Sequence, residues 1–451
     1  MELPNEYLKE MKDLLKENFN SFFDCYQQES YRGIRINPLK SDIETVQKGI
    51  DMKLSPAPFS EYSFFLPKQA QSIGNYPLHH AGAFYIQEPS AASAVTVLSP
   101  KPGDKVLDLC AAPGGKSTQI AGCLQGKGLL WSNEVVKNRA SVLVCNIERM
   151  GIRNAVVSSC HPTVLCNRLE GFFDKILVDA PCSGEGMFRK DSKVSEQWSR
   201  EHVISCADRQ VSILSAASKA VKECGVMVYS TCTFSLEENE GVVSRFLKEN
   251  DRFILEDSGV SFGRPGYSII QGDGMEKTRR IFPMDMGEGH FVAKFRCTKG
   301  SKGNNVQNYR SKIDPIVKAE AERMFGDLFT IEPYGILSSH KEKILLLPDK
   351  LPMIEGIPVL RAGVMLGELK KSRIEPSHAL FMASRPEEHK KLLAYRSDSS
   401  WIRSFLKGEE LEVDDHLSGF IGVAVDSVMI GFGKCSNGRF KNRYPKGLRI
   451  L

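Results

Sequence analysis

The sequence lacks several features that would place a protein in a class at once. None of its 12 cysteines forms a Cys-x-x-Cys pair or a Cys/His series with zinc-ligand spacing, so no structural metal site is expected. The start, MELPNEYLKEMKDLLKENF, has no basic segment followed by an apolar stretch and a cleavage site, and no apolar run approaches the roughly 20 residues of a membrane-spanning helix. We therefore expect a soluble, cytoplasmic protein with reduced thiols and no membrane partner.

A large excess of charge of one sign is also lacking. The 451 residues include 60 Lys and Arg against 55 Asp and Glu, a formal net charge of +5, which by itself does not indicate a nucleic-acid partner. The contents of 41% hydrophobic and 25% charged residues are those of an ordinary globular chain, which excludes a largely disordered protein. At roughly 150 residues per domain, the length predicts two or three domains.

From about residue 100 to 232, short apolar runs alternate with helix-like segments. Continuous apolar strands separated by helices need both faces of a parallel sheet covered, so the pattern predicts a doubly wound, mostly parallel α/β domain. In such a domain ligands bind at the carboxyl ends of the strands. The predicted strands are residues 106–109, 128–131, 155–157, 175–178 and 226–229.

The flanking regions follow other patterns. The first twenty residues predict an amphipathic helix, and the polar stretch 298–312 predicts a linker. Beyond it, Asp314 and Pro315 predict the start of a helix that ends at Gly326, and strand-like runs at 343–347, 357–360 and 420–425 predict a mixed α+β module. We expect an N-terminal subdomain, the α/β domain, the linker and a C-terminal domain at residues 1–78, 79–297, 298–312 and 313–451.

The segment VLDLCAAPGGKSTQIA predicts a strand, a turn of small residues and a helix. Its N–H groups and helix dipole favour a polar or anionic part of a cofactor. The spacing fits neither a P-loop, since Cys110 stands where the first glycine would be, nor the dinucleotide motif, so a triphosphate is not expected. Glu134 ends the next strand, where an acid can accept two hydrogen bonds from a ribose diol. A tight turn and a surface glutamate without a ligand remain alternatives.

Two cysteines follow neighbouring strands of the predicted sheet. KILVDAPCSGEGMF places Asp179 and Cys182 in one loop, and VYSTCTF places Cys232 at the mouth of the next strand. These side chains are therefore expected at one edge of the sheet. A different group of cysteines lies within helix-like patterns, where we expect buried, unreactive thiols: Cys123, Cys145, Cys206 and Cys224.

Taken together, DLCAAPGGK, DAPCSGEG and YSTCT resemble the Nop/Sun family of RNA cytosine-C5 methyltransferases. RINPLK at 35–40, YIQEPSA at 85–91, GEGHFVAKF at 287–295 and NRYPKGLR near the end resemble its bacterial RsmF branch, so the resemblance covers nearly the whole chain. It implies a Rossmann-like methyltransferase domain, S-adenosylmethionine as the methyl donor, an N-terminal RNA-binding subdomain and a C-terminal PUA-like domain. It also implies the decoding region of 16S ribosomal RNA as the substrate.

The resemblance also implies roles for individual residues. The nucleophile falls on Cys232 and the cysteine that assists release falls on Cys182. Where many relatives carry an Asp after the third strand, this sequence has Ser159, Cys160 and His161, so His161 is a candidate for contacting the adenosine. The implied cofactor residues are Cys110, Ala111, Ala112, Pro113, Gly114, Gly115, Lys116, Glu134, Arg139 and Asp179.

A thiol at Cys232 has a chemical purpose in this setting. Cytosine C5 is a poor nucleophile, and addition of a thiolate to C6 turns the ring into an enamine that can attack a methyl group. Cys182, or a water that it positions, could assist removal of the C5 proton, and Asp179 could contact the ring edge at N3 and N4. We hypothesise that Lys190 is the cation that favours the thiolate. DNA cytosine methyltransferases use a Pro-Cys loop and lack the second cysteine, so the pair favours RNA.

Three alternatives remain open. The core motifs do not distinguish ribosomal RNA from transfer RNA as the substrate. A non-catalytic RNA-binding assembly factor could retain the donor pocket and act by docking alone, although the two cysteines argue against it. A small-molecule or protein methyltransferase would leave Cys232 unexplained.

The last 21 residues, 431–451, contain no Asp or Glu. Lysines and arginines there are interleaved with aromatic residues, which predicts a face that holds phosphates and stacks on bases; a solvated face without a ligand is the alternative. Arg361, Lys370, Lys371 and Arg373 are candidates to extend it. The face comprises Lys434, Arg439, Lys441, Arg443, Lys446 and Arg449 with Phe432, Phe440 and Tyr444.

Overall fold

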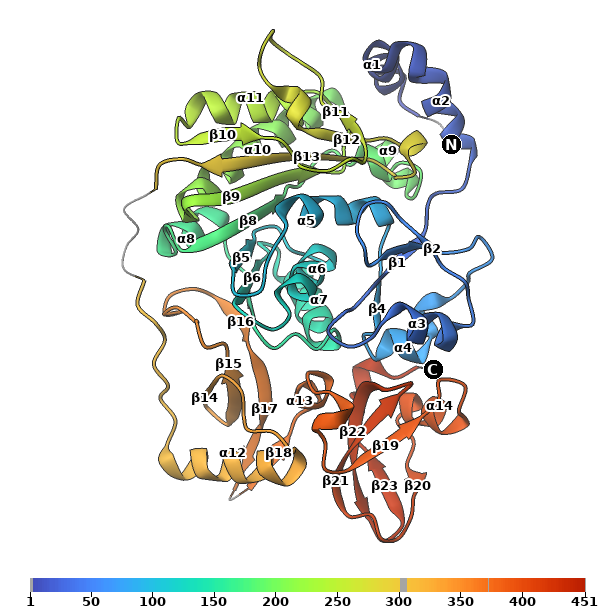
Figure 1. Ribbon diagram of the computed structural model, residues 1–451, viewed down its shortest axis with the longest axis vertical. Coiled ribbons are helices and arrows are strands. Elements are labelled where there is room, and N and C mark those ends of the chain that lie inside the picture. The colour runs from blue at the N-terminus through green and yellow to red at the C-terminus, as the bar shows by residue number, and fades with distance from the viewer. Residues whose placement is uncertain (1–2, 301–305, 372, 451) are drawn as a thin grey trace.

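The computed structural model describes residues 3–300, 306–371 and 373–450 (Figure 1). Its centre is a ten-stranded sheet in the order β11-β12-β13-β9-β8-β5-β6-β7-β16, with β10 paired to β13. Strands β5 to β9 run parallel, whereas β13 and β16 are antiparallel to their neighbours. The strands are β5 Lys105–Asp108, β6 Leu129–Asn133, β7 Ala155–Ser158, β8 Phe173–Asp179, β9 Val221–Thr231, β10 Phe253–Glu256, β11 Arg264–Pro265, β12 Arg279–Ile281, β13 His290–Cys297 and β16 Val359–Ala362.

The doubly wound arrangement predicted from the apolar runs is confirmed. Each of the five predicted runs overlaps one of the strands β5 to β9; β6 and β9 end two residues later than predicted, and β8 and β9 begin earlier. The chain adds β6 and β7 on one side of β5, then returns to add β8 and β9 on the other side. This reversal is the switch point at which such sheets bind ligands.

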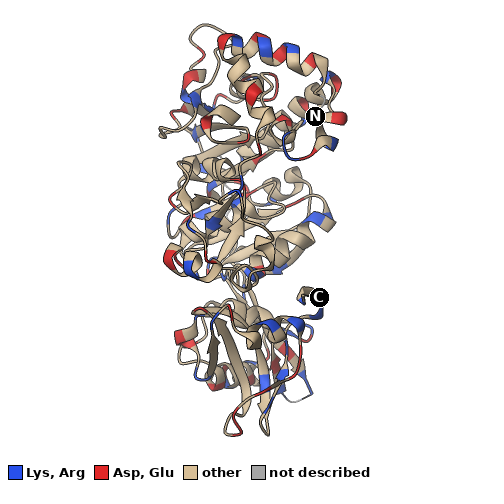
Figure 2. Ribbon diagram, turned by 90° about the vertical axis from the view of Figure 1, so that its right-hand side faces the viewer, with Lys and Arg blue, Asp and Glu red and all other residues tan. Residues whose placement is uncertain are grey.

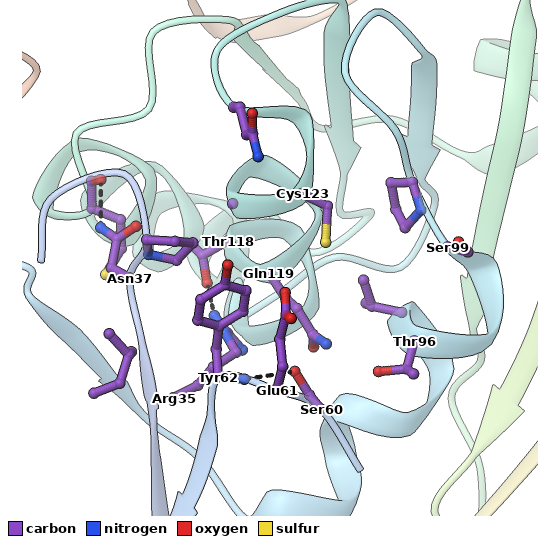
Figure 3. Close-up of a pocket in the computed structure, with 17 residues that line it drawn as sticks. Arg35, Asn37, Ser60, Glu61, Tyr62, Thr96, Ser99, Thr118, Gln119 and Cys123 are labelled. Carbon is purple, nitrogen blue, oxygen red and sulfur yellow. Dashed lines mark hydrogen bonds between the residues drawn. The ribbon is translucent and has the colours of Figure 1, made fainter. Parts of the chain in front are cut away.

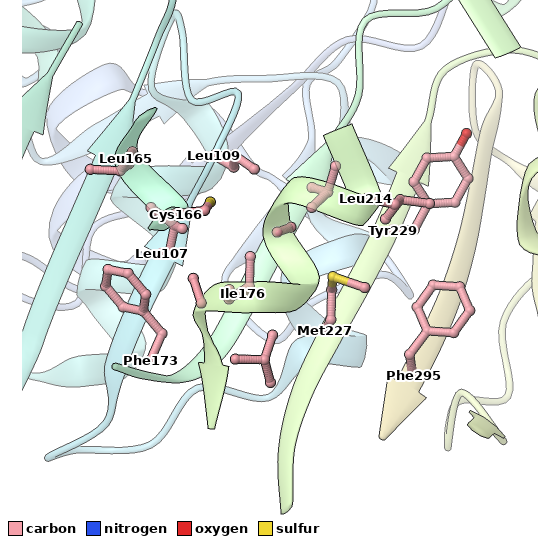
Figure 4. Close-up of a cluster of buried hydrophobic side chains, with 14 of the residues drawn as sticks. Leu107, Leu109, Leu165, Cys166, Phe173, Ile176, Leu214, Met227, Tyr229 and Phe295 are labelled. Carbon is pink, nitrogen blue, oxygen red and sulfur yellow. The ribbon is translucent and has the colours of Figure 1, made fainter. Parts of the chain in front are cut away.

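Alternation along the strands explains how both faces of the sheet are buried. Neighbouring residues of β5 point to opposite faces, so Leu107 packs in one core and Val106 in the other. The first core includes Phe173, Ile176 and Leu214 (Figure 4). It is covered by α8 Pro162–Arg168, α10 Arg200–Ala220 and α11 Glu240–Glu249; the second is covered by α5 Ser93–Leu98, α6 Gly115–Leu124 and α7 Lys137–Arg149.

The N-terminal part forms a four-stranded sheet with two helices beside it, and its first two helices lie apart from the sheet (Figure 1). Tyr7 of the first helix packs edge-on against Phe188 and Trp198, which lie beyond β8 in the chain, so this helix supports the loops of the site. The elements are α1 Asn5–Leu15, α2 Phe19–Asp24, β1 Gly33–Ile36, α3 Ile43–Ile50, β2 Ser55–Pro56, β3 Ser63–Phe65, α4 Pro77–His80 and β4 Phe84–Ile86; α9 Ser192–Glu196 follows the β8 loop.

The C-terminal part contains two further sheets, β14-β15-β17-β18 and β19-β21-β22-β23-β20. Helix α12 begins after Asp314, which caps it, but continues to Leu328. The prediction that Gly326 ends this helix is wrong. The elements are α12 Pro315–Leu328, β14 Ile336–His340, β15 Lys343–Leu347, β17 Val364–Lys370, β18 Arg373–Pro376, α13 His378–Met382, β19 Leu392–Tyr395, α14 Ser400–Lys407, β20 Leu411–Glu412, β21 Gly419–Val425, β22 Val428–Ser436 and β23 Arg439–Asn442.

One C-terminal strand does not belong to these two sheets. The run predicted at 357–360 forms β16, and β16 pairs with β7 at the edge of the central sheet. The prediction that this run is part of a separate C-terminal module is therefore corrected. Within the described residues, no helix combines the length and the apolar character needed to cross a lipid bilayer.

Candidate functional site

The loop between β5 and α6 forms one wall of the site. Gly114 has φ of 114°, a left-handed conformation that side chains disfavour, and it precedes the first residue of α6. Asp108 is buried at the end of β5 and accepts a hydrogen bond from Ser117 Oγ at 2.7 Å. Burial raises the pKa of Asp108 to about 7. This bond ties the first turn of α6 to the end of β5.

A cavity of about 560 Å³ lies at the carboxyl ends of β5, β6, β8 and β9. The loop residues Cys110 and Ala112 line it, as does Glu134, which is buried and accepts a hydrogen bond from Val136 N at 2.9 Å. Arg139 lies 3.5 Å from the Glu134 carboxylate and donates to Ala112 O at 3.0 Å. Arg139 therefore joins the loop to the acidic residue across the cavity.

After β7, the loop with Ser159, Cys160 and His161 is held by a residue of β6. Asn133, which sequence reasoning missed, donates to Cys160 O at 3.0 Å and accepts from Ser158 Oγ at 2.8 Å, so it holds this loop in place. The signal that could have found it is a polar residue at the end of the apolar run LLWSN. His161 lines the cavity and caps α8, because its Nδ1 accepts from Thr163 N at 3.3 Å.

Two thiols face each other on the opposite wall. Cys182 Sγ and Cys232 Sγ are 3.4 Å apart, both are free, and both line the large cavity. A hydrogen bond donated by Cys182 lowers the pKa of Cys232; burial and Asp179 oppose this effect and Lys116 adds to it. The pKa of Cys182 is raised well above its ordinary value by the same hydrogen bond and by burial. Cys232 is therefore the sulfur that ionises first.

Asp179 lies between the thiols and the β5 loop. It accepts hydrogen bonds from Lys116 Nζ at 2.8 Å and from Ser230 Oγ at 2.7 Å. Burial alone would lower the pKa of Lys116, but the Asp179 carboxylate more than offsets this, so the pKa is raised. Lys190, the cation hypothesised to favour the thiolate, is exposed, and its charge acts on His290 and Glu288. In the structure Lys116 takes that position.

Two buried glutamates hold the loops that carry the cysteines. Glu238 accepts from Ser183 N at 3.0 Å and from Gln210 Nε2 at 2.8 Å. Glu185 accepts from Phe234 N at 2.8 Å and from Trp198 Nε1 at 3.0 Å. Sequence reasoning missed both roles, although their acidic side chains within the Gly-rich and Ser-rich loops were a signal. The network fixes the position of one cysteine loop relative to the other.

A smaller cavity of about 240 Å³ adjoins the large one. The two share Cys110, Ala112 and Asp179 in their walls. The smaller cavity also includes Lys116, and Gln87 from the segment after β4. The described residues contain no group of three or more His, Cys, Asp or Glu side chains placed to hold a metal ion.

The four cysteines predicted to be buried agree only in part with that prediction. Cys206 is buried on α10 and Cys123 is partly buried on α6. Cys145 is exposed on α7, and Cys224 is exposed and lies in β9 rather than in a helix. The prediction of buried thiols is wrong for these last two, because an amphipathic helix has an outer face and because β9 begins earlier than its apolar run.

The C-terminal basic face also needs a correction. Phe432, Phe440 and Tyr444 are buried in the cores of the C-terminal sheets and cannot stack on bases. Arg439 and Lys441 flank Phe440 along β23, so they lie on the opposite face of this strand. Lys441 is exposed and lies across from Lys434. Arg361 is buried and pairs with Glu148, so it does not extend this face. Basic and acidic residues are interspersed over the rest of the molecule (Figure 2).

Comparison with family models accounts for most of the chain. Residues 95–296 match the model described as 16S rRNA methyltransferase RsmB/F. Residues 3–89 match the N-terminal domain of 16S rRNA methyltransferase RsmF. Residues 324–383 match the first C-terminal domain of RsmF, and residues 393–450 match the RsmF PUA domain.

Curated relatives and solved structures agree with these matches. Ribosomal RNA small subunit methyltransferase F of Vibrio parahaemolyticus is 33% identical, with 99% of this chain and 97% of the relative covered; the protein of the same name from Vibrio vulnificus is 31% identical over the same shares.

Two solved structures, both from Pyrococcus horikoshii, share the fold. A methyltransferase homologue gives a TM-score of 0.57 at 28% identity, covering 64% of this chain and 93% of its own. The structure of NSun6 with SFG gives a TM-score of 0.58 at 25% identity, covering 66% of this chain and 98% of its own. The chain therefore belongs to the RsmB/F family of 16S rRNA methyltransferases, in its RsmF branch, and is an S-adenosylmethionine-dependent RNA methyltransferase.

Proposed function

We propose that the protein methylates C5 of a cytidine in 16S ribosomal RNA through a covalent bond between Cys232 and C6 of the base. The observation that carries this proposal is the pair of thiols, 3.4 Å apart on the wall of the large cavity, with the pKa of Cys232 lowered and that of Cys182 raised. A methyltransferase acting on oxygen or nitrogen has no use for such a pair. A carbon nucleophile that must be activated by a thiolate does.

The large cavity suits the donor. Its volume of about 560 Å³ lies in the usual range for cofactor sites. The buried Glu134 carboxylate is an acceptor for the ribose diol, and the peptide groups from Cys110 to Ala112 lie beside the N-terminus of α6, which favours a carboxylate. S-adenosylmethionine supplies an electrophilic methyl group when bound. Cys110, Ala112, Glu134 and His161, which line this cavity, would hold the donor.

The residues on the opposite wall suit the base. The Cys232 thiolate forms a bond to C6, and the electrons of the 5,6 double bond make C5 the nucleophile that takes the methyl group. Asp179, oriented by Lys116 and Ser230, accepts from the exocyclic amino group of cytosine. A water positioned by Cys182 accepts the C5 proton, the electrons of the C5–H bond re-form the 5,6 double bond, and the Cys232 sulfur leaves C6 as thiolate.

Ribosomal RNA is favoured over transfer RNA by the parts outside the α/β domain. The N-terminal and both C-terminal matches are to RsmF models, and the full-length relatives carry the name of a small-subunit methyltransferase. We propose the decoding region as the target. An assembly factor that acts by docking alone is disfavoured, because docking needs no thiolate beside a donor cavity.

The test combines a variant with mapping of the product. Cys232→Ala should lower methyl transfer by at least about 10⁴-fold, since a covalent nucleophile is lost, while the Kd for S-adenosylmethionine stays within twofold. Bisulfite sequencing of ribosomal and transfer RNA from cells with and without the protein should show one or more 5-methylcytidines lost from 16S RNA. Full activity of the variant contradicts the covalent step, and a site lost from transfer RNA contradicts the proposed substrate.

A further inference from the structure

Gln87 lies in a position for which the reaction above gives no role. It follows β4 of the N-terminal sheet, in the segment YIQEPSA, and lines the small cavity together with Lys116 and Asp179. A Cβ placed on Gly115 would lie 3.1 Å from Gln87 Nε2. The Gln87 amide group therefore lies against the start of α6, where only a glycine leaves it ample room.

The direction of this amide is set by Arg35 of β1. Arg35 donates from one terminal nitrogen to Gln87 Oε1. From the other it donates to Thr118 Oγ1 at 2.5 Å (Figure 3). A guanidinium can only donate, so the oxygen of Gln87 faces Arg35 and its NH₂ group faces the other way. Among the described residues, no group accepts a hydrogen bond from Gln87 Nε2. A free donor thus lies in the small cavity.

The Arg35 guanidinium is itself held in place, so it can orient the Gln87 amide. It is only 3% exposed, and the described carboxylates form no ion pair with it. Burial lowers the pKa of Arg35 to about 10, so it stays charged at neutral pH. Its two bonds reach one residue of the N-terminal sheet region and one of α6, so the guanidinium links the N-terminal part to the cofactor helix.

We propose that Gln87 donates a hydrogen bond to O2 of the target cytosine, and that Arg35 is the positioning residue that keeps the amide in this orientation. The proposal rests on the proposed function and names a further residue of that site. When the Cys232 sulfur bonds to C6, negative charge moves into the ring and is shared by N3 and O2. A preorganised N–H donor at O2 stabilises this charge more than it stabilises the unreacted base.

The polarity of the cavity agrees with a cytosine edge. The amino group of cytosine needs an acceptor, which Asp179 supplies, and its O2 needs donors, which Lys116 and Gln87 supply. All three side chains line the same small cavity, and Asp179 and Lys116 are joined by a hydrogen bond of 2.8 Å. The cytosine edge would thus meet an acceptor and two donors from three different elements.

The test uses RNA that contains 5-fluorocytidine, because fluorine at C5 cannot leave as a proton and the covalent adduct is trapped. Gln87→Glu has the same shape, can still accept from Arg35, and removes the donor. We expect at least a tenfold slower adduct formation in single turnover, with the Kd for S-adenosylmethionine unchanged. Gln125→Glu, the same change at an exposed position after α6, should match the wild type.

The outcomes separate the two proposals. If the wild type forms no adduct, the proposed function fails, and the role of Gln87 fails with it. If the wild type and Gln125→Glu form it and Gln87→Glu does so at the same rate, the role of Gln87 alone is contradicted. If instead the Kd for S-adenosylmethionine rises tenfold, Gln87 contacts the donor, and the proposal is equally contradicted.

The positioning role of Arg35 is tested by asking whether the effect of changing Arg35 depends on the presence of Gln87. Arg35→Met should slow adduct formation about as much as Gln87→Glu does, and the double variant should be no slower than either single variant. Additive losses would show that Arg35 acts in another way and would contradict its positioning role. If Arg35→Met lowers the melting temperature below the assay range, Arg35→Lys serves instead, since a single ammonium cannot make both bonds in the same geometry.

Discussion

The catalytic edge of the central sheet and the basic face of the C-terminal sheets carry polar residues in opposite ways. At the catalytic edge, Cys182 and Cys232 are half-buried and are held by loops that Glu185 and Glu238 tie down. On the C-terminal face, Lys441 and Arg443 are exposed, and no carboxylate among the described residues pairs with them. One region fixes its functional groups, whereas the other leaves them free to move.

This difference matches what the proposed task of each region requires. Bond formation at a ring carbon depends on the placement of a sulfur to within a fraction of an ångström. Holding a phosphate backbone depends mainly on the number of cations and tolerates mobile side chains. Changes in the first region should therefore affect rate constants with little effect on RNA affinity, and changes in the second should do the reverse.

Of the changes that test this difference between the two regions, Cys182→Ala should have the largest effect on turnover. Release from the adduct loses the group that assists it, so turnover should fall by about 100-fold or more, while a protein band shifted by covalently bound RNA accumulates. The adduct should form faster at pH 8.5 than at pH 7, since the hydrogen bond that lowers the pKa of Cys232 is also lost. Denaturing gel electrophoresis measures both. Cys145→Ala, on the exposed side of α7, is the control, and absence of the shifted band would remove the release role from Cys182.

A smaller effect is expected from Lys116→Met. Lys116 lowers the pKa of Cys232, whereas Asp179 raises it. Without the lysine, the pKa of Cys232 rises and less thiolate is present at neutral pH. The acid limb of the log kcat/KM profile, where the rate falls as pH falls, should therefore move to higher pH by about one unit. Lys127→Met, exposed after α6, should leave the profile in place; an unmoved limb in Lys116→Met would mean that another cation controls the thiol.

The smallest effect is expected from the double variant Lys441→Ala, Arg443→Ala. RNA affinity at 150 mM salt should fall severalfold, and the slope of log Kd against log salt should decrease by about one or two, with kcat unchanged. The matched control is Lys318→Ala with Arg323→Ala on α12, two cations already paired with carboxylates. Filter binding over a range of salt concentrations measures the slope. A lower kcat with an unchanged slope would show that this face affects the rate constant and not RNA affinity, which would contradict the prediction.

The common position of the proposed catalytic residues could be predicted because its signals are local. Parallel strands bring their carboxyl ends to one edge, so Asp179, Cys182 and Cys232 could be placed together from the positions of two strands alone. The cation beside Cys232 could not be identified in this way. Lys116 and Lys190 both follow strands of the same sheet, and only the direction of the side chains, set by the salt bridge to Asp179, decides between them.

The basic face was predicted less well because alternation was overlooked. Basic and aromatic residues one position apart in a strand point to opposite sides, so the aromatics that seemed to belong to the face fill the core instead. The roles of Asn133 and Gln87 depend on contacts between distant segments. The domain bounds at 1–78, 79–297 and 313–451 remain a prediction, as do the linker at 298–312 and the assignment of the cofactor residues.

Strand β16 has a consequence for how the molecule unfolds. It comes from the C-terminal half but completes the edge of the central sheet beside β7, and its removal would leave the N–H and C=O groups on that side of β7 without partners. The two halves therefore share one row of backbone hydrogen bonds. Hydrogen exchange in β7 should then report the opening of the C-terminal half as well, so we expect the chain to unfold as a single cooperative unit. Truncation at residue 297 would expose an unpaired strand edge that is prone to aggregation.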